Sequence, residues 1–367
     1  MLHGIMLLVM VHWFLISVTY LREISWLAIL GAGLLFLLGW LKRDGVKRAL
    51  AWLTQHKKGF LLGAIVFQLI VMVCAELLIR RDAAVVFKGA FELLKQSSIT
   101  NYLSRNPNNI PLFLYEKFFY VLFGSSGLWV MQVLNMLYVN LGAVLLYKLS
   151  QKHFNQKTAD LVYLFYVSLI CYSPYFYSMY TDIPPLPLIA LQLWWSLDLL
   201  KENQAGISWK KMFGLGILSG VTMLIRPTTI IVMIAFWAVL FFRGNWKVFG
   251  KIATVTVMTT GFVFAGLNTA VNHQRVVPIL KEEGLAKGPL LFINLGLTDM
   301  GHNQEDMKEG LLAYIDEDKR SDYNNGLFKK ENVIKEIKRR LKEYGPLGLI
   351  GHIYYKQSLT VAEGTLG

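Results

Sequence analysis

The stretch ELLIRRDAAVVFKGAFELLKQ, residues 76–96, joins an apolar run to a helical pattern of a different kind. The apolar run ends at Ile79, two arginines follow, and Asp82 comes directly after them. Beyond Asp82, apolar residues recur at helical spacing with charged residues between them. This spacing over 83–96 predicts an amphipathic helix lying in the membrane interface. Asp82 is therefore predicted to stand where a membrane helix meets water and a surface helix begins.

The composition indicates a membrane protein. The chain has 367 residues, of which 54% are hydrophobic. Because a bilayer-spanning helix needs roughly 20 mostly apolar residues, the sequence predicts an all-α polytopic membrane protein with about nine transmembrane helices. The predicted spans are roughly 4–21, 23–41, 59–79, 126–147, 158–179, 183–200, 211–225, 228–242 and 249–271.

Positive charge fixes the predicted orientation. The net charge is +13, and lysine and arginine gather in the short loops 42–58, 148–157, 201–211 and 243–251. All four loops fall on one side of the predicted membrane, so that side and the N-terminus are expected to be cytoplasmic. The excess charge therefore predicts contact with a bilayer and not with nucleic acid. The cysteines, Cys74 and Cys171, lie inside predicted spans, which disfavours a disulfide framework or a Cys-based metal site.

The outer side then holds the loop 80–125, the turn at Thr181-Asp182 and the polar segment from 272 onward. We therefore expect a transmembrane core over 1–271, with a candidate site in loop 80–125, and a small extracytoplasmic segment over 272–367. A charged helical pattern occupies 328–343 of that segment.

Loop 80–125 contains several candidate site residues. Asp82 at the start of a helix is stabilised by the partial positive charge of the helix N-terminus. One interpretation is a helix cap paired with Arg80 or Arg81, and the other is a functional carboxylate. The pattern YLSRNPNNIPLFL, residues 102–114, predicts a turn before a second apolar stretch at 110–123. Asn108 and Asn109 fit either turn chemistry or contact with a polyhydroxylated ligand.

Arg226 is the candidate cation. Arg226-Pro227 lies between the short apolar stretches 211–225 and 228–242. An arginine so close to membrane spans is costly without a partner, and a guanidinium suits bidentate contact with phosphate oxygens. The alternatives are that Arg226 snorkels to the interface or pairs with Asp182. Asp182 itself lies in a Thr-Asp-Ile-Pro-Pro turn, which turn chemistry alone also explains.

The order of these motifs resembles that of the GT-C superfamily of membrane glycosyltransferases, in particular the protein O-mannosyltransferase-like, family 39-type branch found in bacteria. The matching features are Asp82 followed by the surface helix 83–96, Tyr102 with Pro107-Asn108-Asn109, Tyr180-Thr181-Asp182, Gly216…Gly220…Arg226-Pro227, Phe292 to Leu297, and Glu363-Gly364-Thr365. The chain departs from many members by having one carboxylate after the span in place of an acidic pair. The resemblance therefore does not support a metal requirement, and no cofactor is expected. It also implies that the chain can continue beyond Gly367, since many relatives carry further spans there.

This resemblance implies transfer of a sugar from a polyprenyl-phosphate donor to an acceptor hydroxyl on the extracytoplasmic face of a bacterial cell membrane, with inversion. Asp82 is then the expected general base. Arg226 is the expected phosphate contact, and Arg81, Asp182, Asn108, Asn109 and Tyr102 are expected to bind substrate. The acceptor is a glycan, a lipid-linked glycan or a protein. The sequence leaves two alternatives: a lipid-linked glycan flippase or transporter, which predicts internal repeats, and a polysaccharide polymerase, which shares the lipid-linked substrate.

Overall fold

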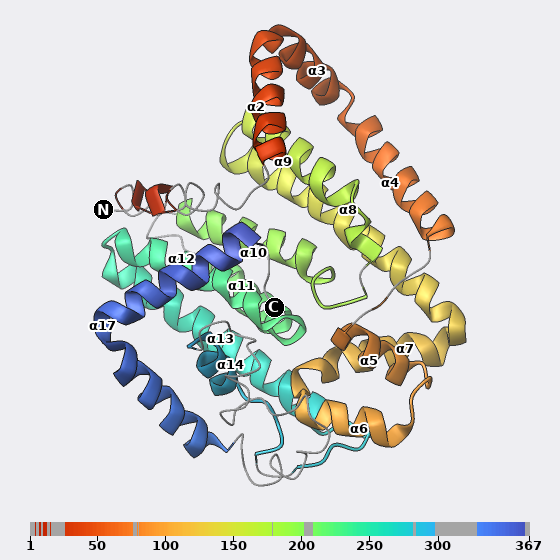
Figure 1. Cartoon of the computed structure of the whole chain (residues 1–367), viewed down its shortest axis with the longest axis vertical. Coiled ribbons are helices and arrows are strands. Elements are labelled where there is room, and N and C mark those ends of the chain that lie inside the picture. The colour runs from red at the N-terminus through yellow and green to blue at the C-terminus, as the bar shows by residue number, and fades with distance from the viewer. Residues whose placement is uncertain are drawn as a thin grey trace. The chain divides into compact units, whose positions relative to one another are not determined.

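The computed structural model describes residues 26–75, 79, 81–177, 179–201, 208–281, 284–297 and 329–363, with isolated positions before residue 26. Every regular element among these residues is a helix, which confirms the predicted all-α class (Figure 1). The elements are α2 (Trp26–Leu41), α3 (Arg43–Gln55), α4 (Lys57–Cys74), α5 (Arg81–Ala90), α6 (Gln96–Arg105), η1 (Pro107–Asn109), α7 (Ile110–Phe123), η2 (Gly124–Ser126), α8 (Gly127–His153), α9 (Gln156–Tyr166), η3 (Val167–Cys171), η4 (Pro174–Tyr177), α10 (Pro185–Lys201), α11 (Trp209–Ile225), η6 (Pro227–Thr229), α12 (Ile230–Phe242), α13 (Trp246–Asn272), α14 (Pro289–Gly296) and α17 (Lys330–Glu363).

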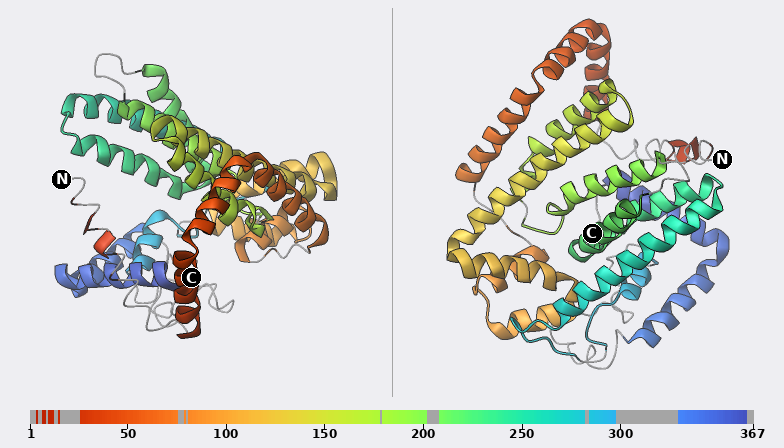
Figure 2. Two further views of the ribbon diagram at one scale, coloured as in Figure 1. Left: turned by 90° about the horizontal axis from the view of Figure 1, so that it is seen from above. Right: turned by 180° about the vertical axis from the view of Figure 1, so that it is seen from behind.

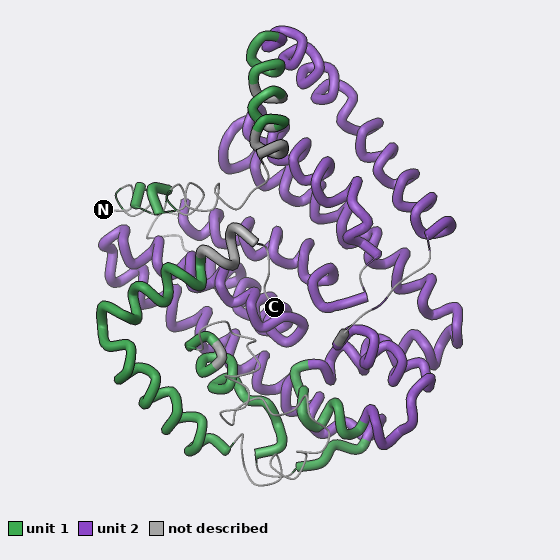
Figure 3. Tube along the Cα trace, in the orientation of Figure 1, with its two compact units in different colours: residues 1–41, 100–108, 278–367 green, residues 42–99, 109–277 purple. Residues whose placement is uncertain are grey.

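The chain forms two compact units, coloured separately in Figure 3. The first contains Met1–Leu41, Thr100–Asn108 and Pro278–Gly367, and the second contains Lys42–Ile99 and Asn109–Val277. We call the second the larger unit; it holds Asp82, Asp182 and Arg226. The expected division at residue 271 is a different partition of the chain and stays a prediction.

Three helical runs in the described part of the chain are long and apolar enough to cross a bilayer. They are Lys57–Cys74, Pro107–His153 and Trp246–Asn272. Within the second run, α8 alone has 27 residues, which at 1.5 Å per residue extends about 40 Å and exceeds the roughly 30 Å hydrocarbon core. A shorter apolar run, Pro227–Phe242, contains α12. Residues 76–78 and 80, between α4 and α5, lie outside the described part.

The predicted short pair at 211–225 and 228–242 corresponds to α11 and α12, which confirms two helices with a break at Arg226-Pro227. α11 lies beside α13 in the views of Figures 1 and 2. Two glycines of α11 make this packing close: a Cβ added at Gly216 would lie 2.6 Å from Thr259, and one at Gly220 would lie 2.8 Å from Val263. This small-xxx-small spacing lets two membrane helices approach closely. The packing therefore fixes the end of α11, where Arg226 follows.

Buried polar contacts tie the other helices of the larger unit together. Gln68 of α4 donates to the Cys171 carbonyl at 2.8 Å and accepts from Asn140 of α8 at 2.7 Å. Gln192 of α10 donates to the Ser219 hydroxyl of α11 at 3.1 Å. Buried polar contacts of this kind specify how apolar helices pack, because a misaligned arrangement breaks the hydrogen bonds between the helices.

The predicted surface helix of loop 80–125 is shorter than its sequence pattern. α5 ends at Ala90, and Glu92 has φ of +59°, a left-handed conformation in which a helix cannot continue. The prediction of one helix over 83–96 is therefore wrong at its C-terminal end. The aromatic residue that follows Ala90 explains the difference: Phe91 is buried between Phe87 and Tyr120, so tertiary packing overrides local periodicity.

In the smaller unit, α14 contains most of the Phe292 to Leu297 motif and contacts α17. The Tyr344 hydroxyl donates to the Leu297 carbonyl at 3.0 Å, and a His352 ring nitrogen lies 2.8 Å from the Gly296 carbonyl oxygen. The helix predicted at 328–343 is confirmed from residue 330 onward, and α17 is kinked at Gly345, where φ is +59°. Residues 298–328 and 364–367, which include part of the Glu363-Gly364-Thr365 motif, lie outside the described residues.

Candidate functional site

The site is built around Arg226, at the break between α11 and α12. Pro227 has no amide hydrogen and disfavours helical geometry in the residue before it, and Arg226 accordingly has extended angles of φ −144° and ψ 104°. Its amide donates to the Thr222 carbonyl at 2.8 Å, and its carbonyl accepts from the Thr229 hydroxyl at 2.8 Å. The backbone at the break is thus held on both sides, which leaves the guanidinium to contact other segments.

Those contacts are with the turn before α10. Arg226 Nη2 lies 2.8 Å from an Asp182 carboxylate oxygen, and Nη1 donates to the Thr181 hydroxyl at 3.0 Å. The guanidinium carbon is 5.7 Å from the centre of the Tyr180 ring, within cation–π range. The predicted alternative that Arg226 pairs with Asp182 is therefore confirmed. Both side chains keep about a third of their surface exposed, with 32% accessible on each, so the pair is open to a further ligand.

Asp82 lies close enough to this turn to act on Tyr180 electrostatically. Burial and the Asp82 carboxylate raise the pKa of the Tyr180 phenol, and the Arg226 guanidinium opposes part of that rise. Asp82 is exposed and stands in the first turn of α5, where the helix N-terminus favours a negative charge. Asp82, Asp182 and Arg226 therefore all act on one residue, Tyr180, although 144 residues separate the first from the last (226 − 82 = 144).

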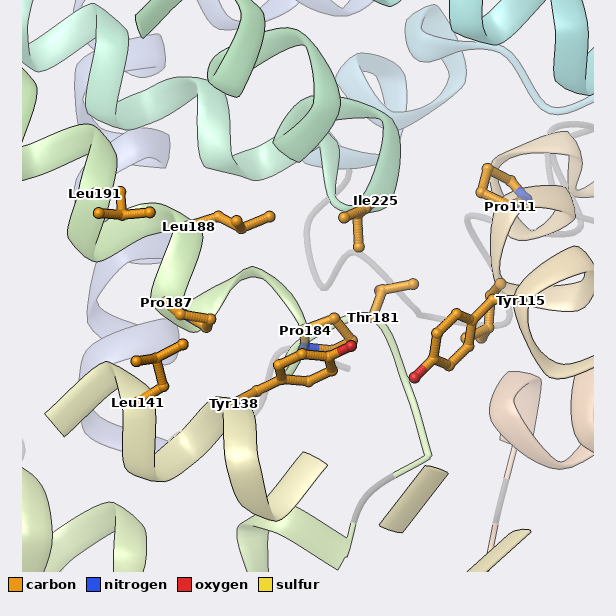
Figure 4. A pocket seen from close by; sticks show the side chains of 11 residues that line it. Pro111, Tyr115, Tyr138, Leu141, Thr181, Pro184, Pro187, Leu188, Leu191 and Ile225 are labelled. Atoms are coloured by element: carbon orange, nitrogen blue, oxygen red, sulfur yellow. The ribbon is translucent and has the colours of Figure 1, made fainter. Parts of the chain in front are cut away.

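An apolar pocket of about 350 Å³ adjoins the site. Figure 4 shows its walls, to which α7, α8, α10, the turn before α10 and the end of α11 each contribute. Two lining residues join it to the charged group: Thr181 accepts the Arg226 hydrogen bond, and Ile225 directly precedes Arg226. The lining residues are Pro111, Leu112, Tyr115, Tyr138, Leu141, Thr181, Pro184, Pro187, Leu188, Leu191 and Ile225.

Other predicted site residues have different environments. Asn109 is buried with 2% of its surface exposed, immediately before α7. Asn108 is exposed and Tyr102 is half-buried on α6, and both belong to the smaller unit. Arg81 is the first residue of α5, and its side chain lies outside the described part. The structure therefore groups Asp82, Asp182 and Arg226, and the binding roles of the remaining four stay predictions.

The sequence reasoning missed the pocket walls. Tyr115 and Tyr138 come from α7 and α8, and their hydroxyls point toward one another across the pocket (Figure 4). Nothing in the local sequence distinguishes these two tyrosines from interfacial aromatic residues. Pro184 and Pro187 mark the start of α10, and the usual reading of prolines there is helix initiation. Only the tertiary arrangement brings these residues together as the walls of one pocket.

An all-helical chain with three bilayer-length apolar runs, charged residues gathered at helix ends and an apolar pocket beside them defines an integral membrane protein. The model of the family described as conserved hypothetical integral membrane protein matches residues 8–367, and the chain belongs to this family. That description assigns no activity. Comparison with curated proteins and with solved structures found no match.

Proposed function

We propose that this protein is a membrane glycosyltransferase that moves a sugar from a polyprenyl-phosphate donor to an acceptor hydroxyl on the extracytoplasmic face. The observation that carries the proposal is the placement of a carboxylate, Asp82, and a paired guanidinium, Arg226, beside an apolar pocket. The proposed topology is the predicted one, with about nine spans and a cytoplasmic N-terminus.

The pocket fits the apolar part of such a donor. Its lining is almost entirely aliphatic, prolyl and aromatic, and burying one methylene group of a ligand contributes about 0.8 kcal/mol. A few isoprene units within a pocket of about 350 Å³ therefore supply much of the binding energy. The polar exit at Thr181 leads toward Arg226, which is where the phosphate at the end of the chain belongs.

Arg226 suits the phosphate because its two terminal nitrogens present a planar fork. The fork is held by Asp182 and Thr181, so it is oriented before a ligand arrives. During transfer, the bond between the sugar C1 and the phosphate oxygen breaks, and its electron pair goes to the phosphate. Arg226 stabilises the charge that develops there.

Asp82 suits the acceptor side. The acceptor hydroxyl attacks C1 from the face opposite the phosphate, and its proton passes to the Asp82 carboxylate, so the anomeric configuration inverts. General-base assistance of this kind contributes about 10²–10⁴-fold in rate. Asp82 is exposed, and it is a carboxylate that acts on Tyr180 without belonging to the Arg226–Asp182 ion pair.

The test is sugar transfer from a labelled polyprenyl-phosphate hexose in proteoliposomes, with Asp82→Asn compared with wild type. Asp44→Asn is the matched control, because Asp44 is an exposed acid in the first turn of α3. We expect Asp82→Asn to lose about 10²–10⁴-fold in rate and Asp44→Asn to keep the wild-type rate. Equal transfer by all three proteins would exclude Asp82 as the base, and absence of transfer with every hexose donor would exclude the transferase class.

A further inference from the structure

A second pocket, of about 280 Å³, lies in the larger unit on another side of α7. It is lined by the end of α5, the turn that follows it, the first turn of α6, α7 and the segment after α13. In contrast to the first pocket, it contains a carboxylate, an ammonium group and an amide, from Glu92, Lys117 and Gln96. Phe113 and Val277 also line this pocket, and both are buried apolar residues.

The charged pair in this polar pocket is well defined. Lys117 Nζ lies 2.6 Å from a Glu92 carboxylate oxygen, and the Tyr120 hydroxyl lies 3.4 Å from the other oxygen. Lys117 also lies over the Tyr120 ring, 4.7 Å from its centre. The Lys117 ammonium, by hydrogen bond and charge, holds the pKa of the Glu92 carboxyl below its usual value. The pair cancels its own charge, so the pocket presents strong donors and acceptors with no net charge.

The backbone at this pocket is strained. Glu92 is the non-glycine residue with positive φ among those described, at +59°, and such a conformation costs about 1 kcal/mol or more. Two hydrogen bonds hold it, from the Glu92 amide to Gly89 at 3.2 Å and from the Leu93 amide to Lys88 at 2.7 Å. Strain that the surrounding structure maintains is concentrated at binding sites. Here it turns the Glu92 side chain toward Lys117.

The polar pocket is linked to the proposed base by one helix. Asp82 lies in the first turn of α5, and Gly89, the penultimate residue of the same helix, lines the polar pocket. Seven residues separate the two positions, so they lie about 10 Å apart along the helix axis. The faces of α7 complete the arrangement: Leu112 and Tyr115 line the apolar pocket, while Phe113 and Lys117 line the polar one. The two pockets therefore lie on different faces of α7.

We propose that the polar pocket binds a neutral saccharide, the part of an extended acceptor about 10 Å from the hydroxyl that reacts. This inference rests on the proposed function and narrows its acceptor class. Carboxylate, ammonium and amide groups match the hydroxyls of a sugar, and the absence of net charge disfavours a phosphate or an acidic peptide. Because the pocket and Asp82 are separated, a single sugar cannot occupy both positions.

The experiment blocks the polar pocket with a covalent label and measures saccharide binding and enzymatic activity in separate assays. Gln96→Cys is made in a Cys74→Ala background, which removes the exposed native thiol and leaves the buried Cys171, and is labelled with a bulky maleimide. Ser97→Cys, exposed on the same helix and outside the pocket lining, is the labelled control. The probes are glucose and a β-1,4-linked glucose tetramer. Binding is read by saturation-transfer NMR, and chemistry by donor hydrolysis and by transfer to each probe.

We expect the label at position 96 to raise KM for the tetramer about tenfold or more, equivalent to about 1.4 kcal/mol, and to leave donor hydrolysis and transfer to glucose unchanged. The label at position 97 should change none of these. The pair Glu92→Gln with Lys117→Met should reproduce the KM effect without affecting kcat.

Failure of the inference is distinguishable from failure of the proposed function. Tetramer binding to wild type that is absent, or unaffected by the label at position 96, overturns the saccharide site whatever the activity is. A loss of hydrolysis with the same label also overturns it, since the pocket would then serve the reacting centre. If wild type neither hydrolyses nor transfers while the label still abolishes tetramer binding, the saccharide site stands and the proposed function falls.

Discussion

Replacement of Arg226 tests the site most directly, because its two terminal nitrogens contact different partners. Nη2 meets Asp182 at 2.8 Å and Nη1 meets Thr181 at 3.0 Å. Lysine has a single nitrogen at the end of its chain and can keep one of these contacts, whereas methionine keeps neither. Comparing Arg226→Lys with Arg226→Met therefore separates the contribution of the two-nitrogen guanidinium geometry from the contribution of the positive charge.

The expected stability loss follows from the exposure of the contacts. An exposed ion pair contributes about 0.2–1 kcal/mol, and with a third of each side chain exposed we take about 1 kcal/mol for the pair with Asp182. The hydrogen bond to Thr181 involves a charged donor, and after discounting for solvent it contributes about 1 kcal/mol more. Arg226→Met should thus lower the free energy of unfolding by about 2 kcal/mol, and Arg226→Lys by about 1 kcal/mol.

The assay is denaturant unfolding in mixed micelles, together with transfer from the polyprenyl-phosphate donor. Combining Arg226→Met with Asp182→Asn gives a double-mutant cycle whose coupling should be about 1 kcal/mol. In transfer, losing the cation beside the leaving phosphate should lower kcat by about 10²–10³-fold. Arg226→Lys should keep part of this activity.

Two results would refute this reasoning. Wild-type stability and donor KM for Arg226→Lys would mean that the fork is not used. A coupling near zero in the cycle would mean that the observed Asp182 contact has no energetic role. Either outcome would support the alternative interpretation, in which Arg226 lies at the membrane interface and binds no specific ligand.

Three further predictions concern other parts of the larger unit. Leu188→Trp, which partly fills the apolar pocket, should raise KM for a long polyprenyl donor more than for a short one. Equal changes in the two KM values would show that the polyprenyl tail binds outside this pocket. Glu116→Met should raise the free energy of unfolding by about 1–3 kcal/mol, because Glu116 is fully buried and neither carboxyl oxygen has a hydrogen-bond partner among the described residues; a destabilised variant would contradict this. Lys117 lowers the pKa of Glu92 from its ordinary value of 4.5, so the stability that Glu92 contributes is complete above about pH 4.5 and disappears as pH falls through the lower pKa of the folded protein. The difference in stability between wild type and Glu92→Gln should therefore vanish in acid, and a difference that grows there would disprove the pairing.

The break at Arg226 was predictable because its cause is local. Proline ends a helix through its own geometry, and the apolar runs on both sides fix its position. Pairing with Asp182 was one of two alternatives, the other being an arginine that snorkels to the interface. The sequence indicates that an arginine near a membrane needs a polar partner, but it does not identify that partner. The spacing of Gly216 and Gly220 likewise predicts close packing but not the identity of α13 as the neighbour.

The pockets were not predictable because their walls come from distant segments. Residues of α7, α8, α10 and α11 line the apolar pocket, and each looks like an ordinary membrane-helix residue in its own segment. The end of α5 was mispredicted for a related reason. Residues 90, 93 and 94 continue the apolar stripe, but burial of Phe91 against Tyr120 stops the helix and turns Glu92 toward Lys117.

The arrangement around α7 fits the proposed transferase better than a transporter of a solute that has no lipid tail. α7 has 14 residues, which extend about 21 Å and fall short of the roughly 30 Å hydrocarbon core. An apolar pocket and a polar pocket lie on different sides of this one short helix. A transporter needs one solute to contact a continuous path from face to face, with its binding site near the bilayer midplane. Under the proposed function, these two pockets of opposite character take two different substrates, a lipid in the apolar pocket and a sugar in the polar one. A transported solute without a lipid tail would have to fit both pockets, and no such ligand fills an aliphatic cavity and also satisfies the Glu92–Lys117 pair. A lipid-linked glycan fits both pockets, so sugar transfer in the proteoliposome assay is the result that separates the transferase from the flippase.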